Sequence, residues 1–520
     1  MTAVDAADTL PIPRLMARAA ARFPDRPALV CDGSRVTWQA FDARCRRVAN
    51  ALISLGIGRG DRVCILSRNS IPMVEVYAGT LYAGACAALL PTMASPDALA
   101  RMAADAAPKA LFVDGGLADL GQPLAAGLRT LAPGGCVAVG FEAPGWVAYE
   151  TLLAHAAETD PAVVADPADP FNIIYSSGTT GIPKGIVHDH AMRSFQLGRM
   201  AAFEVDETSV VALSTPLYSN TTLVGLIPAL ATGACTVIMP KFDVAGFLDL
   251  CQRERVTHTM LVPVQYQRIM AHPDFDAYDL SSMRVKWSTS APLRAAVKRD
   301  IVARFPGKMI EIYGLTEGGP VAVLSATEFP DKLESVGRAG EGVELKVIDD
   351  DGNELPQGAV GEVVGRSGGM MAGYHNRPDL TAEVHWRDRD GRLFYRSGDM
   401  GRFDEDGFLY LSDRKKDVII SGGLNIYADD LERVLLAVDG VVDAAVIGVP
   451  SDAWGETPLG LVVLAEGGGG DAGAILAAAN ARLGKSQRLS AVEVRDSLPR
   501  SPIGKILKRD LRAPYWRDQS

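Results

Sequence analysis

One stretch of the chain, residues 175–185, combines the residue types that bind a polyphosphate. It reads YSSGTTGIPKG, in which two serines, two threonines and three glycines surround a single lysine, Lys184. Glycines let backbone N–H groups turn toward a ligand, hydroxyl groups add donors, and the lysine adds a point charge. The segment is not a P-loop, because Pro183 precedes the lysine and Gly185 follows it. Taken alone, this composition also fits a surface turn with a solvated lysine.

A loop of this kind needs a rigid support, and the preceding and following segments are patterned to provide one. An apolar run at residues 171–174 leads directly into the loop, and further apolar runs of strand length alternate with helical segments. In residues 41–55, apolar side chains recur at spacings of three and four after Thr37, a suitable helix N-cap. This alternation predicts an α/β fold with a large N-terminal body of mostly parallel sheets covered by helices.

The pattern changes in the last third of the chain. After about residue 335, glycines become dense and strands short, which predicts a small β-barrel-like section. The charged run SDRKKD at residues 412–417 precedes a compact set of helices and strands, which predicts a small α+β domain. We therefore expect an N-terminal domain over residues 1–414 and a C-terminal domain over residues 415–520.

The overall composition argues against several classes of protein. The 520 residues include 52 basic and 63 acidic side chains, and the formal net charge is −11. This acidic balance argues against nucleic-acid partners, and the length predicts two or more domains. Seven scattered cysteines argue against a disulfide framework or a zinc site. Two uncharged stretches, residues 76–96 and 213–240, are broken by proline and glycine. We therefore expect no membrane span and, without a secretory signal, a cytoplasmic location.

Four further sequence segments, taken together with the glycine-rich loop, form a recognisable set of motifs. In chain order they read YGLTE at residues 313–317, FYRSGD at 394–399, DRKKD at 413–417 with ISGGLNI at 420–426, and LPRSPIGKILKRDL at 498–511. Together with the loop, they resemble the motifs of the adenylate-forming superfamily in content, order and separation. The chain is identified as a member of this superfamily, closest in type to the acid–CoA ligases.

The resemblance implies a reaction in two halves. A carboxylate attacks the α-phosphate of ATP to give an acyl-adenylate and pyrophosphate, and a thiol, usually that of CoA, then displaces AMP. The first half is a substitution at phosphorus, in which a protein mainly positions the reactants and neutralises spreading charge. ATP and CoA are therefore the implied co-substrates, and Mg²⁺ is the implied cofactor.

The resemblance also assigns the ATP site residue by residue. The residues that would wrap the β- and γ-phosphates are Ser176, Ser177, Gly178, Thr179, Thr180, Gly181 and Lys184. Thr316 would hydrogen-bond the α-phosphate, and Glu317 would bind Mg²⁺ as a hard oxygen ligand. The residues expected around the adenine are Ser290, Ala291, Pro292, Tyr313 and Gly314, with Ser290 standing where the family more often has glycine. Asp399 would accept hydrogen bonds from the ribose hydroxyls, assisted by Arg414.

The resemblance implies that the C-terminal domain is a mobile lid that alternates between two poses. Lys505 would carry the adenylation step, because its ammonium could bridge the attacking carboxylate and the α-phosphate. Lys416 is the expected hinge, and the pose for thioester formation would present Gly422 and Gly423, which leave a path for pantetheine. Trp454 could contact the adenine of CoA or simply pack against the protein.

The acyl pocket is expected at Tyr218, Ser219 and Asn220, where the sequence departs from the family. Ser219 stands where the family often has a histidine that gates the acyl site. Relatives that activate amino acids often have an aspartate there, so a serine counts against α-amino acids. Asn220 could hydrogen-bond a ring hydroxyl of the substrate, or it could satisfy backbone groups in a bend.

We therefore expect an AMP-forming carboxylic acid–CoA ligase acting on a medium-chain or an aromatic, phenylpropanoid-type acid. One alternative is a stand-alone adenylating enzyme that loads the pantetheine of a carrier protein. A non-catalytic nucleotide-binding relative is disfavoured, because Lys184, Glu317, Asp399, Arg414 and Lys505 are all present. A luciferase-like oxidase would use the same adenylation residues. A monomer and a homodimer are equally compatible with the sequence.

Overall fold

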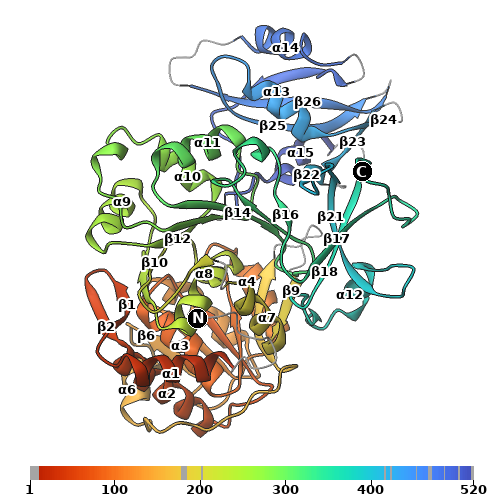
Figure 1. Cartoon of the computed structure of the whole chain (residues 1–520). Coiled ribbons are helices and arrows are strands. Elements are labelled where there is room, and N and C mark those ends of the chain that lie inside the picture. Colours follow the sequence, from red (N-terminus) through yellow and green to blue (C-terminus); the bar gives the residue numbers. More distant parts are fainter. Residues whose placement is uncertain are drawn as a thin grey trace. The chain divides into compact units, whose positions relative to one another are not determined.

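The computed structural model describes residues 11–176, 184–200, 203–414, 417–421, 424–451, 454–465, 471–484, 487–501 and 504–516. Contacts between Cα atoms divide the chain into two compact units, coloured along the sequence in Figure 1. The first comprises Met1–Leu333, Ala339–Glu344 and Arg366–Tyr395, and the second comprises Glu334–Arg338, Leu345–Gly365 and Arg396–Ser520. The hinge predicted at Lys416 lies outside the described residues, so the lid domain over residues 415–520 stays a prediction.

The first unit contains an eight-stranded sheet that ends in the predicted phosphate loop. Its strand order is β19-β9-β8-β4-β3-β5-β6-β7. The strands are β3 (Arg62–Leu66), β4 (Cys86–Leu89), β5 (Ala110–Asp114), β6 (Cys136–Val139), β7 (Val147–Ala148), β8 (Pro170–Ser176), β9 (Lys184–Asp189) and β19 (Gly373–Tyr374). From β8 to β7 the neighbours run parallel, whereas β9 pairs antiparallel with both β8 and β19.

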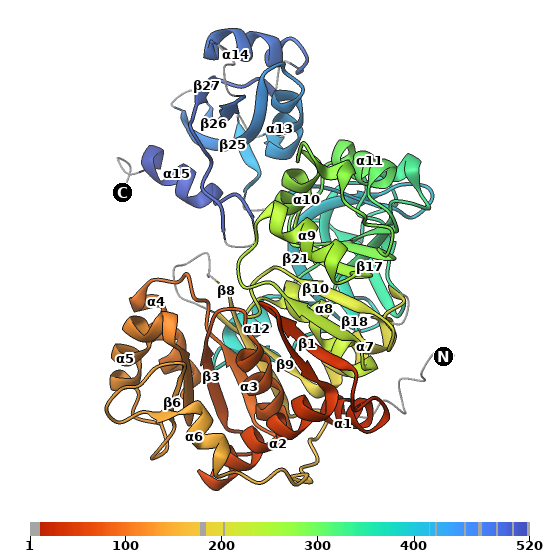
Figure 2. The same cartoon turned by 90° about the vertical axis from the view of Figure 1, so that its left-hand side faces the viewer.

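Both faces of this sheet are covered by helices, as the near-continuous apolar strands predict. Along β3, Val63 and Ile65 join a core with α2 and α3, while Cys64 and Leu66 join a second core with α4 and α5 (Figure 2). The helices are α2 (Trp38–Ser54), α3 (Ile71–Tyr82), α4 (Pro96–Ala106), α5 (Ala118–Gly127) and α6 (Tyr149–Ala154). Helix α2 begins at the predicted N-cap, Thr37, whose hydroxyl accepts from the backbone N–H of Ala40 at 3.3 Å.

A second sheet, of nine strands, carries the other half of the predicted site. Its order is β16-β15-β14-β13-β12-β10-β11-β1-β2, and the run from β14 to β1 is parallel. The strands are β1 (Pro27–Cys31), β2 (Ser34–Thr37), β10 (Val210–Leu213), β11 (Cys235–Ile238), β12 (His258–Leu261), β13 (Val285–Ser288), β14 (Lys308–Gly314), β15 (Val321–Ser325) and β16 (Arg338–Ala339). A core of its own packs this sheet against α9 (Val244–Arg253), α10 (Pro263–Met270) and α11 (Ala295–Arg304).

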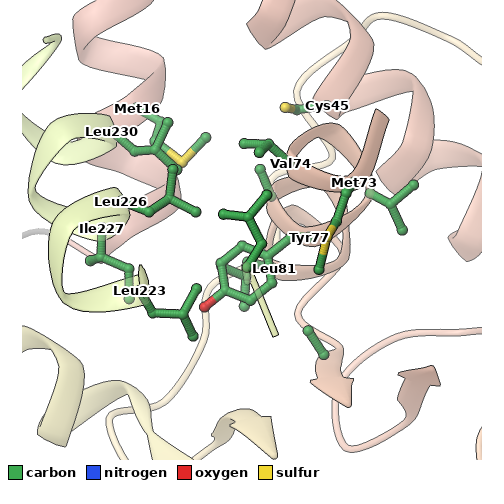
Figure 3. Close-up of a cluster of buried hydrophobic side chains, with 14 of the residues drawn as sticks. Met16, Cys45, Met73, Val74, Tyr77, Leu81, Leu223, Leu226, Ile227 and Leu230 are labelled. Carbon is green, nitrogen blue, oxygen red and sulfur yellow. The ribbon is translucent and has the colours of Figure 1, made fainter. Parts of the chain in front are cut away.

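Helix α8 (Asn220–Thr232) belongs to the core that joins the two sheets. Figure 3 shows Leu223, Leu226 and Leu230 of α8 pointing toward side chains of α3, with Met16 of α1 (Ile12–Arg22) beside them. Helix α7 (His190–Met200) follows β9 and also packs against α8. The first residues of α8 are therefore fixed from several sides, which matters because Asn220 is one of them.

Two smaller sheets complete the chain. One has the order β17-β18-β21-β20, with β22 paired to β21. The boundaries between the two units fall within β17, β18 and β21. Its elements are β17 (Val343–Ile348), β18 (Gly361–Ser367), α12 (Pro378–Glu383), β20 (His385–Arg387), β21 (Leu393–Phe403) and β22 (Leu409–Arg414). The other has the order β24-β23-β26-β25, with β27 on β26. Its elements are β23 (Ile419–Ser421), β24 (Leu424–Ile426), α13 (Ala428–Leu436), β25 (Val441–Ser451), β26 (Gly455–Leu464), α14 (Ala472–Asn480), β27 (Ala491–Val494) and α15 (Lys508–Trp516).

The predicted α/β fold class, with its large body of mostly parallel sheets and a smaller, half-barrel-like sheet, is confirmed. The two uncharged stretches form α3 with β4 and α8 with β11, as expected from their proline and glycine breaks. Among the described residues, no helix has the length and apolarity needed to cross a membrane. All seven cysteines are free thiols.

Candidate active site

The two ends of the glycine-rich loop are held together by the β8–β9 strand pair. Ser176 and Lys184 lie directly opposite each other in its register. The residues between them, including Ser177, Gly178, Thr179, Thr180 and Gly181, lie outside the described residues, as does the side chain of Ser176. The ammonium of Lys184 lies 5.2 Å from the ring centroid of Tyr374, a cation–π contact.

Glu317 is tied to the same tyrosine. The hydroxyl of Tyr374 donates to Oε1 of Glu317 at 2.9 Å and lies 3.0 Å from the hydroxyl of Tyr395. Burial, followed by the nearby Glu317 charge, raises the pKa of Tyr374, so this phenol remains a donor at neutral pH. The second carboxylate oxygen of Glu317 forms no hydrogen bond or ion pair with any described residue.

The chain turns sharply just after Glu317. Gly318 has φ +72°, and a Cβ there would lie 1.7 Å from the carbonyl oxygen of Gly369. The backbone N–H of Met371 donates to the carbonyl of Glu317 at 2.8 Å. The turn therefore requires glycine and brings residues 369–371 against the Thr316–Glu317 segment.

A buried histidine holds the neighbouring Thr316. Nε2 of His188 lies 2.7 Å from the Thr316 carbonyl oxygen, and Nδ1 lies 2.7 Å from Nη2 of Arg193 and 3.2 Å from Nδ2 of Asn172. A carbonyl only accepts and a guanidinium only donates, so His188 is the neutral tautomer with its hydrogen on Nε2. Burial, followed by the charge of Arg193, accordingly places the pKa of His188 well below its usual value.

The sequence analysis did not assign His188 to the site. Among the described residues, no group of three or more histidine, cysteine, aspartate or glutamate side chains could hold a metal ion, so a metal does not explain this histidine. The signal that could have identified it is a polar triplet in strand and helix positions that should be apolar: Asn172 in β8, His188 in β9 and Arg193 in α7, all buried.

Arg193 continues this series of contacts to the head of α8. Its Nη1 donates to Oδ1 of Asn220 at 3.0 Å and to Oε1 of Gln196 at 2.8 Å. Its Nε and Nη2 both donate to Oδ1 of Asn172, at 3.2 and 2.9 Å. The side chain is 1% exposed, and burial lowers its pKa to about 10.

The predicted acyl-pocket residues lie where α8 begins. Ser219 is the N-cap, and its hydroxyl accepts from the backbone N–H of Thr221 at 3.3 Å. Tyr218 is buried, and burial raises the pKa of its phenol. Asn220 is the first residue of the helix. The serine at position 219 therefore caps the N-terminus of α8.

The predicted adenine-site segments emerge from neighbouring strands. Residues 289–292 follow β13, Tyr313 and Gly314 end β14, and these two strands are parallel neighbours. Glu311 of β14 accepts from the backbone N–H of Leu293 at 3.2 Å and forms a buried ion pair with Lys298. Burial raises the pKa of Glu311, and Lys298 opposes this rise. This pair fixes the segment that contains Ala291 and Pro292.

Ser290 explains one departure from the family pattern. Its φ is +81°, in the left-handed region that glycine adopts freely and a side chain disfavours by about 1–2 kcal/mol. Its hydroxyl lies 2.5 Å from that of Thr221 in α8. The hydrogen bond offsets part of the backbone strain and joins the predicted adenine-site segment to the helix that begins at the predicted acyl pocket.

The second unit contains the remaining predicted residues. Asp399 and Arg414 face each other across β21 and β22, with Nε of Arg414 3.0 Å from Oδ1 of the buried Asp399. Lys505 lies in a turn, where its backbone N–H donates to the Ser501 hydroxyl at 3.1 Å and its side chain is exposed. Trp454, between β25 and β26, is 62% exposed. Lys416, Gly422 and Gly423 lie outside the described residues.

Comparisons with known proteins show the family to which the chain belongs. The sequence profile of AMP-binding enzymes matches residues 16–375, and that of the AMP-binding enzyme C-terminal domain matches residues 430–505. The chain is 32% identical to indoleacetate–CoA ligase of Aromatoleum aromaticum, over 95% of this chain and 94% of that protein. It is 30% identical to the fatty acid–[acyl-carrier-protein] ligase ScoC of Streptomyces coeruleorubidus, over 96% of this chain and 95% of that protein. Its fold is similar to that of ATP-bound MatB from Rhodopseudomonas palustris, with a TM-score of 0.88, 29% identity, and coverage of 98% and 100%.

Proposed function

Because the chain belongs to the AMP-binding enzyme family, we propose that it is an AMP-forming carboxylic acid–CoA ligase, with ATP, CoA and an acid as substrates. The observation that carries the proposal is an unbroken series of contacts through the first unit. In order, it joins Lys184, Tyr374, Glu317, Thr316, His188, Arg193 and Asn220, and it continues from Thr221 to Ser290. Residues proposed for the phosphates, the adenine and the acyl group therefore share one connected structure.

In the first half-reaction, the first unit supplies the phosphate-binding groups. Lys184 and the loop that it ends bind the β- and γ-phosphates, and Thr316 donates to the α-phosphate, where charge grows during attack. Glu317 fits a Mg²⁺ ligand, because one carboxylate oxygen is held by Tyr374 while the other is left for an ion. When bound, Mg²⁺ would neutralise phosphate charge, and it commonly takes only one or two protein carboxylates beside ATP.

The proposed roles in the second unit follow from the motif match. Asp399 binds the ribose hydroxyls and is oriented by its ion pair with Arg414. Lys505 supplies the cation for adenylation, Lys416 is the hinge, and Gly422 and Gly423 line the pantetheine path. The exposed ring of Trp454 is available to the adenine of CoA. A cytoplasmic location and a monomeric or homodimeric state are predictions from the sequence.

For the acid, we propose a medium-chain or an aromatic, phenylpropanoid-type carboxylate. Support comes from relatives named for an aromatic acid and for a fatty acid, and from Ser219, which supplies no charge for an α-ammonium group. A carrier protein in place of CoA is the second candidate, because one relative is named for that acceptor.

One panel of assays tests the function. Pyrophosphate release is measured with short, medium, long, aryl and phenylpropenoic acids, with CoA, with a pantetheine-loaded carrier protein and without a thiol. The proposal predicts pyrophosphate release that needs ATP and an acid, followed by an acyl-CoA product and AMP. Thioester on the carrier but never on CoA would favour the second candidate, and no pyrophosphate with any acid would overturn both.

A further inference from the structure

Arg193 presents an unusual arrangement for a buried charge. A guanidinium has five N–H donors, and in Arg193 they meet acceptors on four side chains: Asn172, Gln196, His188 and Asn220. All four acceptors are neutral, and among the described residues no carboxylate forms an ion pair with this arginine. Buried charges are normally paired, because removal from water is costly. The retention of an unpaired cation here calls for a role beyond packing.

The donor-only character of Arg193 fixes the orientation of Asn220. Because Nη1 of Arg193 can only donate, the atom that faces it at 3.0 Å must be the amide oxygen of Asn220. The NH₂ group of Asn220 must then point away from the guanidinium. It forms no hydrogen bond with any described residue, and it lies at the first position of α8, next to Ser219.

We propose that Arg193 is a positioning residue for acyl recognition, which holds Asn220 so that its NH₂ group donates to an oxygen acceptor on the acyl group. The preferred acids then carry a carbonyl, carboxylate or similar oxygen in addition to the reacting carboxylate. This proposal rests on the proposed function, and it names the class of acid within it. The unpaired charge of Arg193 behind the amide strengthens the preference, because it favours an acceptor that carries negative charge.

The test compares two substituents that differ in hydrogen bonding and little in size. Phenylpropenoic acids with a meta or para acetyl group are compared with the same acids carrying an isopropyl group, which cannot accept. The measured quantity is the acetyl-to-isopropyl ratio of kcat/KM for pyrophosphate release. A fraction of unfolded enzyme cancels in this ratio, so a merely structural defect does not change it. One hydrogen bond to a neutral acceptor predicts a ratio of about 3–10 for the unmodified chain at the better ring position.

Three variants separate positioning from stability. Asn220→Asp keeps the acceptor for Arg193 but has no NH₂ donor, so the ratio should fall to about one or below. Arg193→Met frees the amide, so the ratio should fall in the same direction. Lys286→Met is the matched control, because Lys286 is a second buried cation on neutral acceptors, the carbonyls of Phe305, Pro306 and Gly307 at 2.6–2.9 Å. It should lower stability and leave the ratio unchanged.

The outcomes distinguish this inference from the proposed function. Activity with hydrocarbon acids, combined with a ratio near one in the unmodified chain, would overturn the inference alone. A preference that survives in Asn220→Asp, or in a folded Arg193→Met variant, would also overturn it. If Arg193→Met does not fold, the Asn220→Asp result decides. Absence of pyrophosphate release with every acid, in contrast, would overturn the proposed function itself.

Discussion

The ring of His188 donates to the backbone carbonyl of Thr316 at 2.7 Å, across 128 positions of sequence. This contact joins the strand that leaves the glycine-rich loop to the segment that carries Thr316 and Glu317. Because the carbonyl and the hydroxyl of Thr316 belong to one residue, fixing the former restricts where the latter can point. The relationship therefore predicts that a residue with no expected contact to ATP controls the geometry of adenylation.

Substitution of this histidine tests the relationship. His188→Leu leaves the Thr316 carbonyl without its donor, and an unsatisfied buried group costs about 1–3 kcal/mol. We expect kcat for pyrophosphate release to fall about 10–100-fold, because 1.4 kcal/mol corresponds to a factor of ten. His258→Leu is the control, since that histidine is equally buried but its ring faces Thr257 and Trp287. Similar losses of kcat in the two variants would contradict a specific role.

The hydrogen bond from Tyr374 to Glu317 predicts that Tyr374 affects how activity depends on Mg²⁺. Its hydroxyl donates to Oε1 of Glu317, so Tyr374→Phe frees that carboxylate to rotate. We expect the Mg²⁺ concentration for half-maximal activity to rise by about 3–10-fold, the equivalent of about 1 kcal/mol, the typical net contribution of one hydrogen bond. Tyr395→Phe removes a hydroxyl that contacts Tyr374 and not Glu317, and it should change this concentration less. Equal Mg²⁺ curves for both variants and the unmodified chain would argue against Glu317 as the ligand.

The left-handed backbone at Ser290 predicts an inverted order of stability. At most positions alanine is better tolerated than glycine, but at φ +81° the alanine Cβ is strained. Ser290→Ala loses the hydrogen bond to Thr221 and keeps the strain, whereas Ser290→Gly loses the bond and relieves the strain. Urea denaturation should therefore show the glycine variant more stable than the alanine variant by about 1 kcal/mol. The usual order, with alanine the more stable, would refute the strain at this position.

Buried histidines predict a fall in stability on mild acidification. Burial lowers the pKa values of His190 and His258 to about 4, and that of His188 well below its usual value. An unfolded histidine binds a proton near pH ~6.5, so the unfolded state binds more protons between about pH 6.5 and 4. The free energy of unfolding should fall as pH falls through this window, by up to about 1.4 kcal/mol per pH unit for each histidine. His258→Leu should show a shallower pH dependence, and an unchanged slope would contradict the assignment.

The elements of the fold could largely be predicted from the sequence, because local patterns decide them. Thr37 caps its helix and residues 171–174 lie in a buried strand, as expected, since apolar periodicity and cap chemistry act over a few residues. The division into compact units depends on contacts between distant segments, such as residues 345–365 with the C-terminal part, and no local pattern reports these.

Only those residues of the candidate site that lie in recognisable sequence motifs could be predicted from the sequence. Thr316 and Glu317 stand in a recognisable segment, whereas Arg193 and Asn172 became site candidates only once the fold placed them beside His188. Polar residues at otherwise apolar positions could mark such an arginine as unusual, but its four acceptors come from β8, β9, α7 and α8, and no local pattern reports that they meet. Tertiary structure alone brings those elements together.

The most direct test of the account is a comparison of the two half-reactions in Lys505→Ala. Acyl-adenylate formation is measured as pyrophosphate release. Thioester formation is measured separately, with chemically supplied acyl-adenylate and CoA. The account predicts that adenylation falls by at least about 100-fold, because a charge-stabilising group is lost from the transition state, while thioester formation is nearly unchanged. Equal loss of both half-reactions, or full adenylation without Lys505, would contradict it.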